Sequence, residues 1–457
     1  MFGSGYLVIK IIKFQSGFVV KTKFSRGFIF ITEGHNCQSS IKNREARILS
    51  ENFSFHHLET DDDVEQHLEL MRNVFGQNSR IDLQVRKWID HHPMMTLKDF
   101  FVIKHRGRIV ACLNIIPSRW SVGGIELKVS ELGCVATLPE YRHQGLQKRL
   151  HDEYHRQLLE QGYDLSAIEG IPYFYRQFGY EYALPLLERP TISLDKVPDC
   201  KIDHKIRPFS SRDIPQADRL FKKSQEKFYV HTIRDEGIWK MQQEPSMVAE
   251  YKFEGYAVEE EGEMAAYFRI NYNFEEKELL LREITDVNQT AAQSILGFLK
   301  DIGKQRGLAT LVATISYQDF FTQHMVAIGG MRNVRPYAWQ LRVMDYVKIF
   351  QKMKPLFEER LAKSAYCRLT EKLNFNFYRF TVQMTVEDDV IMNVQRLDAG
   401  EDRSIRSSPL VFTQLLFGYR SREELETMYP DFMVSPSQEH LVDVLFPKMP
   451  SYIHTEY

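Results

Sequence analysis

Hydrophobic and polar positions change period several times after residue 52, and these changes predict alternating strands and helices. Residues 53–58 alternate apolar and polar side chains, as a strand does. Residues 61–75 open with three aspartates and continue with apolar residues at helical spacing, which predicts a capped helix, and a second helix follows at 82–90. Apolar runs at 100–104 and 109–120 predict two strands joined by a short turn.

The clearest pattern spans residues 129–182. Residues 129–137 are mostly apolar and β-branched with one carboxylate, which predicts a strand, and Pro139 ends it. Residues 165–169 predict a further strand. Between them, residues 146–161 form an amphipathic helix whose apolar face carries Leu150, Tyr154, Leu158 and Leu159.

The turn into this helix has the chemistry of an anion site. Gly145 stands at the helix entrance, where the absence of a Cβ lets the backbone approach a ligand. The N–H groups of the first turn and the positive end of the helix dipole then suit a pyrophosphate, and Arg142 and His143 add side-chain donors. A strand, a basic glycine turn and a helix also occur as a plain connection, so the pattern alone leaves both interpretations open.

Two motifs resemble those of the GNAT N-acetyltransferases. Arg142-x-x-Gly145, after the strand, is similar to the acetyl-CoA loop R/Q-x-x-G-x-G/A, with Gln147 in place of the small sixth residue. The segment from Tyr173 to Tyr180 resembles the FY-x-x-x-GY element that closes the GNAT site. The resemblance implies an α/β (α+β) fold with a mixed, mostly antiparallel sheet and flanking helices for a catalytic domain at 51–190. It also implies acetyl-CoA as the co-substrate.

The resemblance implies roles for individual residues. The backbone of Val135, Ala136 and Thr137 pairs with the pantetheine arm as an added strand would. Tyr175 matches the general acid of the family, and Tyr173 and Tyr180 are its rivals in the same segment. The pyrophosphate is held by the loop residues Arg142, His143, Gln144, Gly145, Leu146 and Gln147.

Two further domains are expected. Residues 205–340 repeat the strand and helix order but lack an Arg-x-x-Gly between the strand at 279–286 and the helix at 290–303, so a degenerate GNAT domain without coenzyme is predicted. Residues 343–457 carry a short helix at 347–352, an alternating stretch at 375–386 and a helix that stops at Gly418. This third region resembles the sterol-carrier-like α+β domain that ends the Eis family, in which the three domains occur in the same order.

The Eis resemblance points to an unusual general base. It implies that the main-chain carboxylate of the last residue, Tyr457, enters the active site of the first domain. The final segment is aromatic and is stiffened by Pro447 and Pro450, which favours a docked tail although chain ends usually fray. Glu131 is the alternative base, because histone-type GNAT enzymes carry a catalytic glutamate four residues before the position of Val135.

Composition narrows the function classes. The net charge of −2 over 457 residues argues against nucleic acid as a partner. Five cysteines without a CxxC pair indicate neither a zinc site nor a disulfide framework, and the histidine pairs at 56–57 and 91–92 lack a third ligand, so no metal site is predicted. A reducing cytoplasm fits this cysteine usage.

The first fifty residues differ from the rest in charge. They carry eight Lys or Arg against two acids, a net +6 that leaves −8 for residues 51–457. Lys10 and Lys13 interrupt the apolar run, which is too short to span a bilayer and has no signal cleavage site. Residues 1–50 are therefore expected to be an appended extension that packs weakly or is disordered.

Together these features predict an acetyl-CoA-dependent N-acetyltransferase that acts by direct attack of a primary amine. An aminoglycoside, a polyamine or a lysine is the expected acceptor, and the family resemblance implies a homo-oligomer such as a hexamer. The alternatives are a protein that senses acetyl-CoA or binds an apolar ligand without turnover, and a dedicated protein-lysine acetyltransferase.

Overall fold

The computed structural model describes residues 10–14, 17–21, 53–199, 202–243, 247–249, 251–399 and 405–454. The predicted base Tyr457 and most of the extension 1–50 lie outside these residues. The chain divides into two compact units, one formed by residues up to Ser54 with Lys104–Gly107, the other by Phe55–Ile103 and the chain from Arg108 onward. In the first unit, β1 (Lys10–Phe14) and β2 (Gly17–Lys21) pair antiparallel. Within the described residues, no helix combines the length and the apolar character needed to cross a bilayer.

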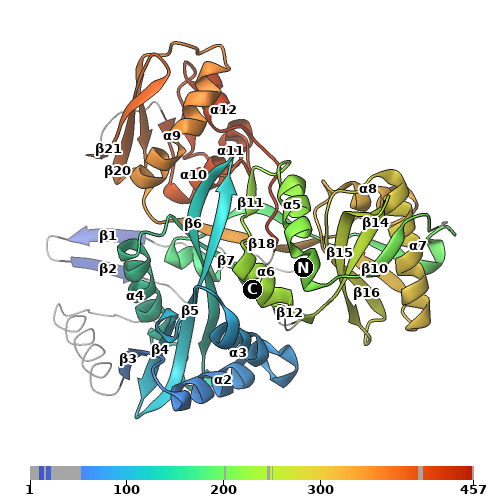
Figure 1. Ribbon diagram of the computed structural model, residues 1–457. Coiled ribbons are helices and arrows are strands. Elements are labelled where there is room, and N and C mark those ends of the chain that lie inside the picture. Colours follow the sequence, from blue (N-terminus) through green and yellow to red (C-terminus); the bar gives the residue numbers. More distant parts are fainter. Residues whose placement is uncertain are drawn as a thin grey trace, which may run out of the picture. The chain divides into compact units, whose positions relative to one another are not determined.

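The first sheet has eight strands and is mixed, as the fold class predicts (Figure 1). β5 and β6 pair antiparallel over most of their length, whereas β6 and β7 run parallel. The helices α2 (Asp61–Phe75), α3 (Ile81–His91) and α4 (Leu146–Glu160) begin within one residue of the predicted positions. The strand order is β3 (Phe53–His57), β4 (Phe100–His105), β5 (Arg108–Val122), β6 (Ile125–Thr137), β7 (Leu165–Glu169), β18 (Val334–Val343) and β8 (Glu181–Glu188), with β11 (Val230–Thr232) beside β5.

The second sheet repeats the element order of the first. A strand and the helix α5 (Ile214–Gln225) are followed by a hairpin, a strand, the helix α7 (Gln289–Gln305) and a strand that pairs parallel. A separate short hairpin, β12–β13 (Met247–Val248 and Tyr251–Lys252), precedes the hairpin of this sheet along the chain. The strand order is β10 (Lys205–Pro208), β14 (Glu254–Glu260), β15 (Glu263–Asn273), β16 (Glu278–Ile284), β17 (Thr310–Ala313) and β9 (Thr191–Ser193).

Two strands pair with a sheet other than the one formed by their neighbours along the chain. β18 follows the elements of the second sheet along the chain, yet it lies between β7 and β8 of the first sheet. β9 follows β8 along the chain, yet it pairs with β17 of the second sheet. Each sheet is therefore completed by a strand from the other part of the chain, and residues 334–343 support the first sheet.

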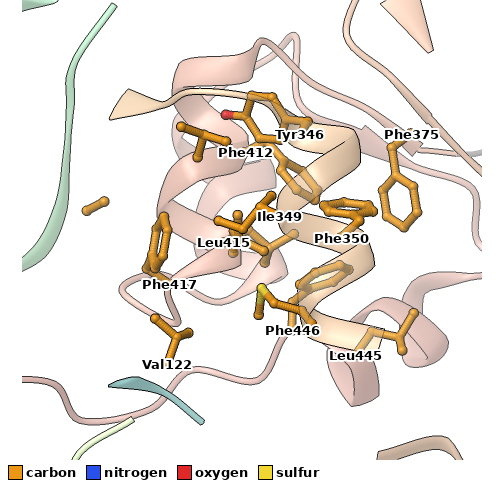
Figure 2. Packing of buried hydrophobic residues seen from close by; sticks show 14 of the residues in the cluster. Val122, Tyr346, Ile349, Phe350, Phe375, Phe412, Leu415, Phe417, Leu445 and Phe446 are labelled. Atoms are coloured by element: carbon orange, nitrogen blue, oxygen red, sulfur yellow. The ribbon is translucent and has the colours of Figure 1, made fainter. Parts of the chain in front are cut away.

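The third region is an α+β arrangement with a filled interior. The helix α9 (Tyr346–Ala362) is longer than the predicted segment 347–352 and packs on a five-stranded sheet. Figure 2 shows the buried rings between them: the centroids of Phe350 and Phe375 are 4.9 Å apart, and those of Phe412 and Phe446 are 5.4 Å apart. The remaining elements are β19 (Glu371–Asn376), β20 (Phe380–Glu387), β21 (Val390–Asp398), β22 (Ile405–Arg406), β23 (Met433–Val434), α10 (Pro409–Leu416), α11 (Arg422–Met428) and α12 (Glu439–Leu445).

Candidate active site

The strands β6 and β7 separate at the point where the sequence predicts the coenzyme arm. Their parallel pairing ends at Glu131 opposite Ala167, but β6 continues to Thr137. Beyond Glu131 the register with β5 shifts, and Cys134 takes a positive φ of 48°, so the strand bulges at this point. The strand edge of residues 133–137 that faces away from β5 can therefore accept an extended ligand as an added strand.

The loop before α4 leaves the start of the helix open. Gly145 is the N-cap residue, with φ 74°, and no side chain makes a capping hydrogen bond there. A Cβ built at Gly145 meets no atom within 4 Å, and the neighbouring loop residues are exposed. Arg142 Nε lies 3.3 Å from the Thr137 carbonyl oxygen and donates to it, which holds the loop against the end of β6. Peptide N–H groups at such a helix start bind phosphate groups.

Two of the predicted loop residues point inward. Leu146 is buried in the core. Gln147 reaches back to the end of β6, where its Nε2 donates to the Ala136 carbonyl oxygen at 2.8 Å and to Thr137 Oγ1 at 3.0 Å. A glutamine at the position of the small family residue therefore ties α4 to β6, and only its backbone can contribute to an anion site. Arg142, His143 and Gln144 remain exposed, as the anion-site prediction requires.

Of the three candidate tyrosines, Tyr175 is the one that lines the main cavity. It lies in the short 3-10 helix Phe174–Phe178 and is 6% exposed. Tyr173 is 80% exposed. Tyr180 is fully buried, and its hydroxyl is bonded to Ser166 Oγ at 2.7 Å and to His155 Nε2 at 3.1 Å. Of the three tyrosines, Tyr175 alone reaches this cavity, and its role as the general acid stays a prediction.

Strand β18 holds the 3-10 helix that carries Tyr175. Gln340 Nε2 donates to the carbonyl oxygen of Gly170 at 3.0 Å, and Arg342 Nη1 donates to the carbonyl oxygen of Phe178. Behind Phe178, the ring of His151 stacks at a centroid distance of 3.7 Å, and burial lowers the pKa of His151 to about 4. The imidazole is therefore neutral at pH 7 and serves as packing. Sequence patterns around residue 175 give no sign of this support from residues 340 and 342.

The main cavity has a volume of about 1580 Å³ and joins three parts of the chain. β6 contributes Glu131 and the 3-10 helix Phe174–Phe178 contributes Tyr175, so the structure brings both predicted groups to one cavity. Cys134 also lines it, but burial raises the pKa of this thiol to about 12, which excludes a thiolate nucleophile at neutral pH. A second wall, which the sequence did not reveal, is formed by Tyr251 of β13, by Phe253 after it, and by Arg269, Asn271, Arg282 and Glu283 of the second sheet.

The C-terminal tail forms the third wall. Tyr229 N donates to the Pro450 carbonyl oxygen at 2.7 Å, and Tyr452 N donates to the Val230 carbonyl oxygen at 3.0 Å. Farther along, the Tyr452 hydroxyl donates to the Thr314 carbonyl oxygen at 2.8 Å. His454 is 5% exposed and lines the cavity, and burial lowers its pKa to about 4. The tail is thus fixed as far as His454, three residues before Tyr457.

One histidine of each pair has a polar neighbour in the structure. His92 Nδ1 accepts hydrogen bonds from the backbone N–H groups of Met94 and Met95, each at 3.2 Å. His57 Nε2 lies 3.1 Å from Gln157 Nε2. Among the residues that the structure describes, no three His, Cys, Asp or Glu side chains gather in a way that could hold a metal ion.

Comparison with known proteins agrees with this geometry. A family model described as an acetyltransferase (GNAT) domain matches residues 57–183, and a search of curated proteins finds no match. The fold resembles a GCN5-related N-acetyltransferase from Anabaena variabilis, at 15% identity and a TM-score of 0.67 over 89% of this chain and 100% of that one. A probable N-acyltransferase from Enterococcus faecalis (16%, TM-score 0.66) and Eis1 from Mycobacterium abscessus (14%, TM-score 0.60) match over the same shares of both chains. The chain therefore contains a GNAT acetyltransferase domain, and it is an enzyme of the acyltransferase class that takes an acyl-CoA co-substrate.

Proposed function

We propose that the protein is an acetyl-CoA-dependent, Eis-like N-acetyltransferase that acts on a primary amine. One observation carries this proposal: Glu131, Tyr175 and the docked C-terminal tail line a single cavity beside the open edge of β6. A connection that served only to join a strand to a helix would need neither the open strand edge nor the tail.

The residues at the end of β6 and the start of α4 fit acetyl-CoA. Backbone groups of Val135 to Thr137 hold the pantetheine arm, and the exposed loop from Arg142 to Gly145 holds the pyrophosphate with its peptide N–H groups. The bound molecule supplies an acetyl group that is activated as a thioester. The buried Leu146 and the hydrogen-bonded side chain of Gln147 fix the loop from behind.

The remaining chemistry is proton transfer. A base takes a proton from the acceptor ammonium, the neutral nitrogen attacks the thioester carbonyl carbon, and the C–N bond forms as the C–S bond breaks. The leaving sulfur takes the hydroxyl proton of Tyr175, because a phenol can donate to a developing thiolate and is neutral at pH 7. The attacking nitrogen then releases its second proton, which restores the Tyr175 hydroxyl through solvent, and the first proton passes from the base to water. The products are an N-acetyl amine and free CoA thiol.

The base we propose is the main-chain carboxylate of Tyr457. The chain is fixed at His454, and three further residues reach at most about 10 Å, so this carboxylate lies within reach of the cavity that His454 lines. Glu131 is the alternative base. It lies in the same cavity on β6 and is 7% exposed.

The second sheet is proposed to be a degenerate GNAT domain and the third region a domain that positions the tail. In the third region, the buried rings of Phe350 and Phe412 pack with their centroids 5.9 Å apart. The cytoplasmic location and the higher oligomer remain predictions.

Release of free thiol from acetyl-CoA tests the function. The panel contains aminoglycosides, polyamines, lysine peptides and free amino acids. Three proteins are compared: the unmodified chain, a form with three residues added after Tyr457, and Tyr175→Phe. We expect the unmodified chain to turn over acetyl-CoA. In both altered forms, turnover should be suppressed while acetyl-CoA still binds.

Each other outcome has a defined meaning. Full activity of the extended form moves the role of base to Glu131, which Glu131→Gln then tests. Binding of acetyl-CoA without thiol release for any amine contradicts the proposed transfer and favours a coenzyme sensor. Turnover of lysine peptides with none of the small amines favours a protein-lysine acetyltransferase.

A further inference from the structure

The cavity wall from the second sheet carries two arginines on one face. Arg269 and Asn271 are two residues apart on β15, so their side chains share a face. Arg282 lies on β16 where the register between the two strands shifts, and its Nε donates to Asn271 Oδ1 at 2.7 Å. All three residues line the main cavity. Near its bulge, the second sheet therefore exposes guanidinium groups to the cavity. Near its own bulge, the first sheet exposes backbone groups instead.

Aromatic rings fix both guanidinium groups in place. The guanidinium of Arg282 lies 4.2 Å from the ring centroid of Tyr251, and that of Arg269 lies 4.5 Å from the ring centroid of Phe253. Stacked arginines lose little further conformational freedom when they bind, so they recognise planar anions well. The two guanidinium groups are therefore preorganised to bind an anion.

Two arginines and the buried Glu283 lie close together in this wall, and Glu275 of the loop between β15 and β16 also lines the cavity. Arg234 and Arg269 share one carboxylate, that of Glu283, with Arg234 bonded at 3.0 and 2.9 Å and Arg269 at 3.6 Å. Arg269 is 3% exposed, and its Nη2 has no hydrogen-bond partner among the described residues. Within the same described part of the chain, Arg282 forms no ion pair, since only Asn271 and Tyr251 hold it. The buried Nη2 of Arg269, which lacks a partner, and the half-buried guanidinium of Arg282 can therefore take a ligand that accepts hydrogen bonds.

We propose that Arg282 and Arg269 form an anion subsite for the amine acceptor, which therefore carries a carboxylate as well as its reactive amine. This inference rests on the proposed function, because it places the amine beside Glu131 and Tyr175 and the carboxylate at the wall of Arg269 and Arg282 in the same cavity. It names a zwitterionic acceptor, such as an amino acid or a peptide with a free C-terminus, in place of the polycation expected from the sequence.

The charges along the cavity agree with an acceptor of this kind. Its lining includes five glutamates and four arginines, so it has no marked excess of acid that would attract a polycation. The phosphates of the coenzyme have their own site at the start of α4. The planar fork of Arg282 matches a carboxylate, which accepts two parallel hydrogen bonds from one guanidinium.

Calorimetry with CoA present, so that no acetyl group is transferred, tests the subsite. The probes are amino acids and dipeptides with a free carboxylate, each paired with its C-terminal carboxamide. At least one carboxylate is expected to bind about tenfold more tightly than its carboxamide, as hydrogen bonds to a charged group predict. Arg282→Met should remove this preference, and Arg282→Lys, which keeps the charge without the fork, should keep part of it.

Arg306→Met is the matched control. Arg306 stacks on Tyr272 at 4.1 Å in the same way but pairs with Glu254, so its loss should leave the carboxylate preference intact. Equal binding of every carboxylate and its carboxamide overturns the proposal, as does a preference that survives Arg282→Met. Thiol release from acetyl-CoA is measured on the same probes. A carboxylate preference without any thiol release would contradict the proposed function and leave the anion subsite standing.

Discussion

The first and second sheets both lead from a strand through a loop into a helix, but the two helices begin differently. At the start of α4 stands Gly145, and no side chain caps the first turn. At the start of α7 stands Asn288, whose Oδ1 accepts a hydrogen bond from Ala291 N at 2.8 Å. The cap satisfies one of the N–H groups that an anion would need. One helix is thus left open for a ligand, and the other is closed by its own sequence.

The strands before the two helices differ in the same way. β6 continues for six residues past its last pair with β7, which leaves an open edge. In the second sheet, Thr314 N donates to the Leu281 carbonyl oxygen and extends the pairing beyond β17. The Thr314 carbonyl oxygen in turn accepts from the Tyr452 hydroxyl of the tail. These differences support the proposal that the second sheet is a GNAT-like frame without a coenzyme site, because side chains of the same chain hold its helix start and its strand end.

A carboxylate at position 145 should have the largest effect, on the affinity for acetyl-CoA. Gly145→Asp places a negative charge where the pyrophosphate is expected, and the loss of acetyl-CoA affinity should be about 100-fold or more because a charge-assisted site becomes repulsive. Gly145→Asn has the same shape without the charge and serves as the control for strain at φ 74°. Titration calorimetry measures both variants. Equal affinities of the Asp and Asn variants would contradict an anion site at α4.

Displacement of Tyr175 should have the next largest effect. A Cβ at Gly170 would lie 2.2 Å from Tyr175 Cε2, so Gly170→Ala must move the ring. We expect kcat to fall about 10- to 100-fold, because a displaced acid loses most of the benefit of general acid catalysis, while the Kd for acetyl-CoA is unchanged. Steady-state kinetics and calorimetry check this split. An unchanged kcat would argue against Tyr175 as the acid.

Acid should weaken the two sheets in different pH ranges. His67 on α2 is fully buried, neither ring nitrogen has a hydrogen-bond partner among the described residues, and burial lowers its pKa from 6.5 to about 4. Because the unfolded chain then binds the proton more readily, stability falls as the pH drops from about 6.5 to 4. In the second sheet, burial alone would raise the pKa of Glu283, but Arg234 and Arg269 outweigh it and lower the pKa. The stabilisation that this ionised carboxylate provides is complete above the ordinary pKa of a glutamate, and it is lost only as the pH falls below that value.

The variant His67→Leu sharpens this contrast. It should reduce the loss of stability between pH 7.5 and 5 by roughly 2 kcal/mol, the value that a pKa lowered from 6.5 to about 4 implies at pH 5. Thermal unfolding at both pH values, compared with the unmodified protein, provides the measurement. An equal acid-induced drop in both proteins would show that His67 does not titrate on unfolding.

Loss of the cap on α7 should have the smallest effect. Asn288→Ala removes the acceptor for Ala291 N and should cost about 1 kcal/mol of stability, as N-cap substitutions do. Acetyl-CoA binding and turnover should not change. A denaturant titration and a kinetic assay on the same variant measure the two effects, and a changed Kd for acetyl-CoA would contradict a coenzyme site confined to the first sheet.

Local patterns predicted the helices and strands that bury one face, and the predicted bounds agree with the structure to within a few residues. The start of α4 at Leu146 and the strand at 165–169 follow from apolar spacing and from the glycine entrance. The aromatic motif also led to Tyr175, which lies at the cavity. These features depend on near neighbours, so a single sequence contains them.

Features that depend on distant parts of the chain could not be predicted. β18 pairs with β7 and β8 across more than a hundred residues, and no local signal distinguishes it from a strand of the second sheet. The anion wall of Arg269 and Arg282 depends on the bulge between β15 and β16, and the two arginines look like ordinary surface residues in the sequence. The inward turn of Gln147 likewise depends on carbonyl groups of β6 that the folded sheet brings near.

The number of acetyl-CoA molecules bound per chain tests the central claim most directly, that only the first sheet keeps a coenzyme site. Titration calorimetry of the full chain should give one site per chain, and Gly145→Asp should abolish it while Asn288→Ala leaves it intact. Two sites per chain, or one site that survives Gly145→Asp with unchanged affinity, would contradict the account.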